Sequence, residues 1–411
     1  ARQPMAAGRA NRKDGGHSSW YSAGMSHSPE RRRLLRALPA VVIAPGLGAC
    51  GSGDTLPLPP DAPIGPFGAD ATAEQVTAGI DLTDKTALVT GCNSGIGFET
   101  MRVLALRGAH VFGAGRTMQK ATDACGRVEG RTTPVVIELT ALDSVVAAAE
   151  LIRAQTASLD MLICNAGIME LPELEQVNGI EKQFFVNHLG HFVLVNRLLD
   201  RVIAAPQGRI VNVSSGSAVR QAPEEGIEFD NLSGRHGYHP GKAYGQSKLA
   251  NVLFTLELAR RLRPTNATAN ALRPGVILTN LGRHMPRWKT WALEHLGGAF
   301  TKTIAQGAAT TCYVATSPAL ATASGYFFNH CNPHRPGGHT EDTDMAERLW
   351  QTSVELTADY LTDTPTSLFA HDDWSGKPPV RRAATDPRVQ HNRRHAPART
   401  EARNFRRTPR G

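Results

Sequence analysis

The chain has 411 residues, of which 20% are charged and 41% hydrophobic, and its formal net charge is +8 at pH 7. From residue 376 onward eleven Lys or Arg residues stand against Asp386 and Glu401, so this tail carries +9 and residues 1–375 sum to −1. A nearly neutral body and a tail without a recognisable binding fold argue against specific nucleic-acid recognition, although the tail could adhere to polyanions.

The composition of the first 75 residues predicts an N-terminal extension with little regular structure. Arg31, Arg32 and Arg33 precede a mostly apolar stretch at 37–48, and residues 47–50 read Leu-Gly-Ala-Cys. This is the layout of a secretory signal, and residues 47–50 are similar to a bacterial lipoprotein cleavage box, which would attach a lipid to Cys50. Five prolines between positions 57 and 66 predict an extended linker that reaches residue 75.

A regular pattern of strands and helices begins at Lys85. We expect a short buried strand at 86–90, a glycine-rich turn, and a helix at 98–107. Glycines placed where a strand turns into a helix let the backbone approach a pyrophosphate, whose charge then lies at the helix N-terminus. The candidate cofactor-binding residues of this turn are Gly91, Asn93, Ser94, Gly95, Ile96 and Gly97.

The next two predicted strands, 110–114 and 135–139, indicate which nucleotide is bound. Arg116 stands where an NAD-preferring domain places an acid against the ribose, and a cation there suits a 2′-phosphate. NADP(H) is therefore favoured over NAD(H), and the alternatives that Arg116 faces water or stacks on the adenine stay open. Glu138 and Leu139, at the end of the later strand, are expected near the adenine.

A fourth strand, 161–164, is followed by further candidate site residues. Asn187 is the polar residue of the next helix that we expect to face inward, whereas His188 and His191 are interpreted as packing or capping residues. A fifth strand, 209–213, ends at Ser214 and Ser215. The fourth strand leads directly into three candidate cofactor-binding residues, Asn165, Ala166 and Gly167.

Tyr244 and Lys248 open a run with helical spacing of apolar residues. Being four residues apart, they lie one above the other on one helix face. A cation within a few ångströms favours a phenolate, so the pair is suited to moving a proton nearer neutral pH than a phenol normally allows. Such pairs also occur on many surface helices, and the motifs upstream decide in favour of chemistry.

The cysteines are scattered without the C-x-x-C spacing of a disulfide framework or zinc ribbon. They are expected to be reduced and mostly buried thiols. A histidine- and cysteine-rich loop at 330–339 fits no standard metal site, and no metal is predicted. The six cysteines are Cys50, Cys92, Cys125, Cys164, Cys312 and Cys331.

Taken together, these motifs resemble those of the short-chain dehydrogenase/reductase family, and the histidine- and asparagine-containing stretches around Asn187 and Tyr244 resemble its retinol-dehydrogenase-like branch. The resemblance covers about 290 residues. It implies one α/β domain at 76–370 with a Rossmann-type, doubly wound parallel sheet of about seven strands, flanked by flexible extensions at 1–75 and 371–411. The matching pieces are Thr90-Gly91-x-x-x-Gly95-Ile96-Gly97, Asn165-Ala166-Gly167, Asn187, Ser215, Tyr244-x-x-x-Lys248, and Pro274-Gly275 followed by Thr279.

The resemblance also implies roles for the catalytic candidates. Tyr244 would be the general acid/base, Lys248 would lower its pKa and hold the nicotinamide ribose, Ser215 would orient the substrate oxygen, and Asn187 would support a proton relay through water. Hydride transfer changes the protonation of the substrate oxygen, so a titrating group must stand beside that oxygen. The remaining implied coenzyme contacts are Pro274, Gly275 and Thr279, besides Tyr244 and Lys248 themselves.

Two features depart from the family pattern. Ser215 and Tyr244 are 29 residues apart because of an inserted polar loop at 221–240, so Ser214 stays open as a substitute for Ser215. Arg273 stands where relatives often carry His before Pro-Gly, which we expect to alter the pocket wall and not the mechanism.

The sequence therefore predicts an NADP(H)-dependent oxidoreductase that interconverts a hydroxyl and a carbonyl group. Apolar residues at 280–303 suit a small or hydrophobic alcohol, aldehyde or ketone, although they could equally pack a lid onto the body. A silent NADP(H)-binding regulator and a membrane-anchored interaction protein are the alternatives, and a homo-oligomer stays open. A cytoplasmic location is favoured because the coenzyme is cytoplasmic, with export and anchoring through Cys50 as the alternative.

Overall fold

The computed structural model describes residues 56–277 and 301–361. Cys50, Thr279, most of the expected lid and the basic tail at 371–411 lie outside the described residues, so the predictions made for them stay predictions.

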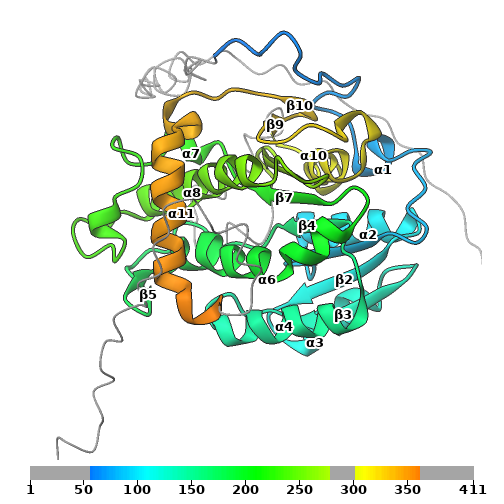
Figure 1. Ribbon diagram of the computed structural model, residues 1–411, viewed down its shortest axis with the longest axis horizontal. Helices are drawn as coiled ribbons and strands as arrows, with labels where there is room; N and C mark the ends of the chain where they lie inside the picture. Colours follow the sequence, from blue (N-terminus) through cyan, green and yellow to red (C-terminus); the bar gives the residue numbers. More distant parts are fainter. Residues whose placement is uncertain (1–55, 278–300, 362–411) are drawn as a thin grey trace, which may run out of the picture. The chain divides into compact units, whose positions relative to one another are not determined.

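The described residues are built around one eight-stranded sheet in the order β10-β9-β8-β7-β4-β1-β2-β3 (Figure 1). All neighbouring strands are parallel except the last pair, in which the two-residue β10 runs antiparallel to β9. The predicted parallel sheet of about seven strands is therefore confirmed, with one short antiparallel edge strand added. The strands are β1 Thr86–Thr90, β2 His110–Gly115, β3 Thr132–Val136, β4 Met161–Cys164, β7 Arg209–Val213, β8 Thr268–Arg273, β9 Phe327–Asn329 and β10 Asn332–Pro333.

Helices cover both faces of this sheet. Successive strand residues point to opposite faces, and in β1 Leu88 joins a core cluster with α4, α6, α8 and α11, whereas Ala87 and Val89 join a second cluster with α1, α2, α3 and α10. The central strands are apolar on both sides, as parallel sheets require. The helices are α1 Ala73–Val76, α2 Gly95–Leu106, α3 Met118–Cys125, α4 Leu142–Gln155, α5 Lys182–Phe184, α6 Gly190–Ala204, α7 Ser217–Arg220, α8 Pro240–Arg261, α10 Ile304–Thr316 and α11 Thr343–Thr357.

The third strand differs from its predicted range of 135–139. β3 begins three residues earlier and ends at Val136, and Pro134 is tolerated because β3 is the edge of the sheet. Glu138 lies beyond the strand end, where its carboxylate accepts hydrogen bonds from the backbone N–H (3.1 Å) and the hydroxyl (2.8 Å) of Thr140. The apolar residues that suggested a strand instead form the turn before α4.

Residues 56–72 form no helix or strand, contain two turns, and are held to the body by specific contacts. The amide of Asn332 donates to the carbonyl of Phe67 (2.6 Å) and accepts from the N–H of Gly65 (2.9 Å). The ring of Phe67 meets that of Tyr313 edge-on, with 5.6 Å between centroids. Helix α1 follows with a capping box at Thr72, and Ala73 is fully buried. Ordered structure therefore begins upstream of the predicted boundary.

Five of the six cysteines lie in the described part, and all five are free and buried, as expected. Within residues 56–277 and 301–361, His, Cys, Asp and Glu side chains form no group of three or more that could hold a metal. In the same part of the chain no helix has the length and apolar character needed to cross a membrane.

Candidate active site

The glycine-rich turn after β1 closes tightly against the loop after β4. Gly91 adopts φ +71°, a conformation that favours glycine, and a Cβ on it would stand 3.1 Å from the Cα of Ala166. A Cβ on Gly97 would stand only 2.4 Å from both the carbonyl oxygen of Gly91 and the amide nitrogen of Asn165. Both positions therefore need glycine for the turn and the loop to lie in contact.

Helix α2 begins inside this turn and leaves its first N–H groups open. Its N-cap, Ser94, makes no side-chain capping hydrogen bond. The guanidinium of Arg127 donates to the carbonyl of Asn93 (3.4 Å) and lies 4.4 Å over the ring of Phe98, which fixes the turn from outside. An uncapped helix N-terminus beside a glycine cradle fits the pyrophosphate of a dinucleotide.

The residues expected around the adenosine half differ in what they offer. Arg116 follows β2 directly, is exposed, and makes no side-chain hydrogen bond or ion pair within the described residues. Leu139 is buried and packs against Gly190 at the start of α6, where a Cβ would stand 2.9 Å from its Cδ2. Arg116 thus presents a free cation, whereas Leu139 presents its backbone.

A buried network joins the end of β1 to the Asn-Ala-Gly loop. The hydroxyl of Thr90 accepts hydrogen bonds from the N–H groups of Asn165 and Ala166, both at 2.9 Å, and lies 3.0 Å from Nε2 of His191. Nδ1 of His191 donates to the carbonyl of Asn187 (3.1 Å), so in the neutral ring Nε2 is the acceptor. Burial lowers the pKa of His191 to about 4, which keeps the ring neutral. His191 is thus a structural link, as predicted for a packing residue.

Asn187 lies in a five-residue π-helical turn, Phe185–Leu189, an irregularity often found at functional sites. Its amide is fully used: Oδ1 accepts from the N–H of Ile168, and Nδ2 donates to the Ile168 carbonyl and to the hydroxyl of Ser247, each at 2.9 Å. Ser247 in turn donates to the carbonyl of Tyr244 (2.8 Å). Asn187 therefore ties the loop after β4 to the helix that carries Tyr244.

Tyr244 and Lys248 both lie on α8, and both side chains are about 4% exposed. The Nζ of Lys248 donates to the carbonyl of Val213 (3.0 Å). Burial raises the pKa of Tyr244 to about 12, against the lowering effect of a hydrogen bond with Ser215, and Glu170 raises it further. Burial also lowers the pKa of Lys248 to about 8. The sequence predicted a phenol of lowered pKa, whereas burial, opposed only by Ser215, raises the pKa of Tyr244.

The two serines after β7 have separate tasks. Ser214 is buried and its hydroxyl donates to the carbonyl of Lys248 (2.7 Å), which fixes α8 to the strand. Ser215 is half-buried, and its hydroxyl donates to the hydroxyl of Ser217 (3.3 Å) and accepts from the Ser217 N–H (3.1 Å). Ser215 also lies close enough to Tyr244 to lower the pKa of the phenol, whereas Ser214 is used by Lys248, so the prediction that Ser215 orients the substrate oxygen is kept.

Pro274 and Gly275 continue from the end of β8, next to β7 in the sheet. Gly275 adopts φ +98°, and a Cβ on it would stand 2.9 Å from Cδ of Lys302. The sheet thus brings the ends of β1, β4, β7 and β8 to one edge, where the four catalytic candidates and most of the coenzyme candidates meet. This is the edge at which doubly wound α/β folds bind ligands.

Comparisons with known proteins agree with this geometry. The sequence model described as short chain dehydrogenase matches residues 85–227. A protein of Brassica napus, short-chain dehydrogenase TIC 32 B, chloroplastic, is 41% identical over 302 residues, which cover 71% of this chain and 94% of that protein. The chain belongs to the short-chain dehydrogenase/reductase family. It is accordingly an NAD(P)-dependent oxidoreductase that acts on CH–OH and C=O groups.

Other relatives of this short-chain dehydrogenase confirm the predicted branch. Human retinol dehydrogenase 13 is 40% identical over 282 residues, which cover 66% of this chain and 84% of that protein. A crystal structure of an uncharacterised protein from Mycobacterium paratuberculosis is 33% identical and has a TM-score of 0.56, covering 70% of this chain and 98% of that one.

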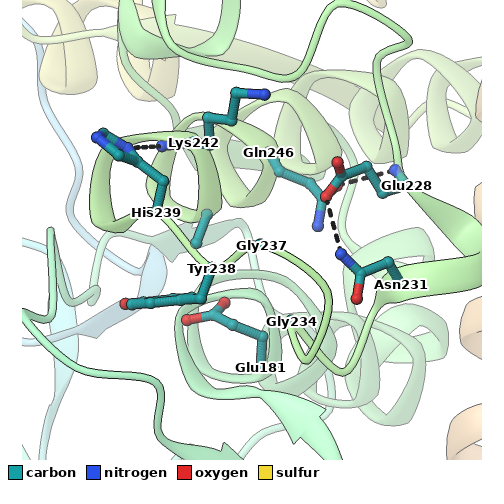
Figure 2. A pocket seen from close by; sticks show the side chains of 10 residues that line it. Glu181, Glu228, Asn231, Gly234, Gly237, Tyr238, His239, Lys242 and Gln246 are labelled. Carbon is teal, nitrogen blue, oxygen red and sulfur yellow. Dashed lines mark hydrogen bonds between the residues drawn. The ribbon is translucent and has the colours of Figure 1, made fainter.

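The inserted loop of this short-chain dehydrogenase encloses a small cavity of about 20 Å³, enough for about one water molecule. Figure 2 shows how Gln246 on α8 accepts from the N–H of Glu228 (2.8 Å), whose carboxylate accepts from Asn231 (3.4 Å). Lys242 and Gln246 line this cavity, and residues 242 and 246 lie about 200° around the helix from residues 244 and 248. The cavity therefore opens on the opposite side of α8 from the phenol.

Some residues of the site carry no clear local sequence signal. Glu170 stands near enough to Tyr244 to raise the phenol pKa, and it accepts from the amide of Gln221 (3.1 Å), yet nothing in its neighbourhood suggests this place. Ser247 lies inside the Tyr-Gly-Gln-Ser-Lys stretch, where spacing alone could have suggested an inward-facing hydroxyl. Thr90 was visible in the motif, but its role as the centre of a network was not.

Proposed function

We propose that this chain interconverts a hydroxyl and a carbonyl group on a small or hydrophobic substrate with NADP(H), and that Tyr244 is the general acid/base. The observation that carries the proposal is the convergence of three side chains at this sheet edge: Lys248 Nζ lies 5.8 Å from the ring centre of Tyr244 on the same helix, and Ser215 is close enough to Tyr244 to lower the pKa of the phenol. When bound, the nicotinamide coenzyme supplies or accepts the hydride.

The environment of Tyr244 supports proton donation. With its pKa raised to about 12 by burial, the phenol is protonated at neutral pH and can give its proton to an oxygen that gains negative charge. Ser215, which lies beside the phenol, can turn its hydroxyl from Ser217 to donate to the same substrate oxygen and hold it in line. The reverse direction needs the phenolate, which burial disfavours, so alcohol oxidation should require a higher pH than carbonyl reduction.

The other candidates position this pair. Asn187 holds the loop after β4 against α8 through Ile168 and Ser247, so its own side chain acts on geometry and not on the proton. Lys248, fixed to Val213, presents its remaining donors toward the place of the nicotinamide ribose. Preference for NADP(H) is supported by the unpaired guanidinium of Arg116 beyond β2, which suits a 2′-phosphate.

The proposal is tested by mixing the purified chain with NADPH and a panel of hydrophobic aldehydes and ketones. Turnover is followed as the fall in absorbance of the reduced nicotinamide. Tyr244→Phe should lower kcat by about 10² to 10⁴ while leaving NADPH binding, read by fluorescence, in place. Tyr326→Phe is the control, because Tyr326 is a half-buried tyrosine on the other sheet face. Equal turnover by wild type and Tyr244→Phe would contradict the mechanism, and NADPH binding without any turnover would favour the silent regulator.

A further inference from the structure

A group of basic side chains lies beside Ser215 on the side of β8 and β9. The N–H of Ser214 donates to the carbonyl of Leu272 (2.7 Å), and continuing the pairing of Val213 with Leu272 brings Arg273, at the end of β8, level with Ser214, the residue before Ser215. Arg273 in turn pairs in register with Asn329 of β9, and His330 follows it. The mechanism proposed above uses none of these basic side chains.

Two further cations reach the same place from other elements. Arg220 ends α7, and its guanidinium nitrogens lie 2.7 and 2.8 Å from the position that a Cβ on Gly216 would take. Lys302 donates its backbone N–H to the carbonyl of Val276 (2.8 Å), and its side chain crosses Gly275. The glycines after Ser215 and after Pro274 are therefore both covered by cationic side chains.

In the part of the chain that the structure describes, these three cations, Arg220, Arg273 and Lys302, make no hydrogen bond or ion pair through their side chains. Arg209 shows what this chain does with a buried structural arginine, because its guanidinium donates to the carbonyls of Val314 (3.2 Å) and Ser317 (2.8 Å). Buried cations that only support the fold are normally satisfied in this way, whereas Arg273 and Lys302 are half-buried without such bonds and Arg220 is exposed beside them.

The cations also repel one another. Burial, and then the charge of Arg220, lower the pKa of Arg273. Burial lowers the pKa of Lys302, and Arg273 adds to this, whereas Asp70 opposes it. The pKa of His330 falls to about 4, first through burial and then through Lys302 and Arg273. A partly desolvated group of like charges gains most from an anion, which would relieve the repulsion and supply acceptors to every free donor.

We propose that Arg220, Arg273 and Lys302 form a subsite for an anionic group, a carboxylate or a phosphate, carried by the substrate away from its reacting carbon. The inference rests on the proposed function, because it takes Ser215 and Tyr244 as the place of the reacting oxygen. The substrate is then an aldehyde or ketone whose far end is negatively charged. Its remaining carbon skeleton can still be apolar.

The sheet order separates this subsite from the coenzyme phosphates. The glycine turn follows β1 and Arg116 follows β2, whereas the three cations lie at β7, β8 and β9 or beside them, on the other side of β4. Lys302 is the member nearest to the coenzyme candidates because it crosses Gly275. Coenzyme binding is therefore measured in every variant.

The experiment compares matched substrates with NADPH: 4-carboxybenzaldehyde against 4-methylbenzaldehyde, and glyceraldehyde 3-phosphate against glyceraldehyde. We expect wild type to prefer the anionic member of at least one pair, and the pair that responds identifies carboxylate or phosphate. Arg273→Met and Arg220→Met should each lower the ratio of kcat/KM for anionic over neutral substrate by about tenfold or more, with partial rescue by Arg273→Lys. Arg131→Met, at the opposite edge of the sheet, should keep the ratio.

A binding measurement keeps this inference separate from the proposed function. Terephthalate and inorganic phosphate are titrated calorimetrically into wild type and Arg273→Met without any reaction, and only wild type should bind one of them.

If neutral aldehydes are reduced in a Tyr244-dependent way while neither the substrate ratio nor anion binding responds to the variants, the subsite is refuted and the proposed function stands. If anions bind wild type alone and no aldehyde is turned over, the subsite stands and the proposed function fails. If the variants weaken NADPH binding as much as they weaken anion binding, the cations serve the coenzyme and the assignment to substrate is refuted.

Discussion

The ammonium nitrogen of Lys248 lies 5.8 Å from the ring centre of Tyr244 and is hydrogen-bonded to the carbonyl of Val213, not to the phenol oxygen. The lysine is thus anchored to the end of β7, and Ser215, two residues further on, lies close enough to Tyr244 to lower the pKa of the phenol. Two buried titratable groups therefore stand on one helix face beside the same strand end.

The pH dependence of stability should report the burial of Lys248. Its pKa is lowered by burial to about 8, whereas a lysine in the unfolded chain titrates near 10.4. Between these values the unfolded chain binds more protons than the folded one, so stability rises with pH in this window. Relative to Lys248→Met, the unfolding free energy of wild type should rise by about 1 kcal/mol per pH unit from pH 8 to 10.

Urea unfolding of both proteins at pH 7, 8, 9 and 10 measures this difference. Lys242→Met, which changes an exposed lysine on the same helix, is the control and should show a difference from wild type that does not vary with pH. A pH-independent difference for Lys248→Met as well would mean that the buried amine keeps an ordinary pKa.

Asn187→Ala should destabilise the fold as well as the site. The substitution removes three buried or partly buried hydrogen bonds, leaves the N–H and carbonyl of Ile168 without their partner, and takes one of two hydrogen bonds from the hydroxyl of Ser247. We expect a loss of about 2–4 kcal/mol of unfolding free energy, measured by urea denaturation. Asn266→Ala, at an exposed position, should stay within about 0.5 kcal/mol of wild type. Equal stability of the two variants would remove Asn187 from its positioning role.

Gly97→Ala should disrupt the coenzyme turn. The new methyl group would stand 2.4 Å from the Gly91 carbonyl and from the Asn165 amide, so the turn or the loop has to move. We expect NADPH affinity, measured by fluorescence titration, to fall by about tenfold or more and stability to fall by about 1–3 kcal/mol. Gly68→Ala is the matched control, because a methyl group there meets nothing within 4 Å. Unchanged affinity in Gly97→Ala would place the coenzyme elsewhere.

Arg116→Ala should reduce the preference for NADPH over NADH. The charge-assisted bond to a 2′-phosphate is lost, whereas a ribose hydroxyl loses little. The ratio of the two dissociation constants should shift toward NADH by about tenfold. Arg131→Ala tests whether any loss of surface charge has this effect. If both variants keep the wild-type ratio, Arg116 does not select the coenzyme.

The sequence was informative where one short stretch contains the whole feature. The glycine turn, the Asn-Ala-Gly loop and the Tyr–Lys helix face each depend on local spacing, and the structure places all three at one sheet edge. The position of β3 was missed because Pro134 reads as a strand breaker unless the strand is known to lie at an edge. The direction of the Tyr244 pKa was missed because burial is a tertiary property.

The proposed basic subsite could not be predicted from the sequence, because its members are brought together only by the tertiary structure. Arg220, Arg273 and Lys302 come from a short helix, a strand end and the segment before α10, and only the register of β7, β8 and β9 brings them together. Arg273 was noticed as a departure from relatives, but a single unusual residue does not reveal its neighbours. The three hydrogen bonds of Asn187 also join segments that are up to 60 residues apart.

Helix α8 carries Tyr244 and Lys248 on one side, and on the opposite side it carries Gln246, which binds the loop at residues 221–240. Gln246 holds the middle of that loop through the N–H of Glu228, whereas Gln221, at its start, binds Glu170, which raises the pKa of Tyr244. Loop grafts from relatives that replace the part around Glu228 should therefore change the surface and keep proton transfer, whereas grafts that also replace Gln221 should shift the pH profile of the reaction.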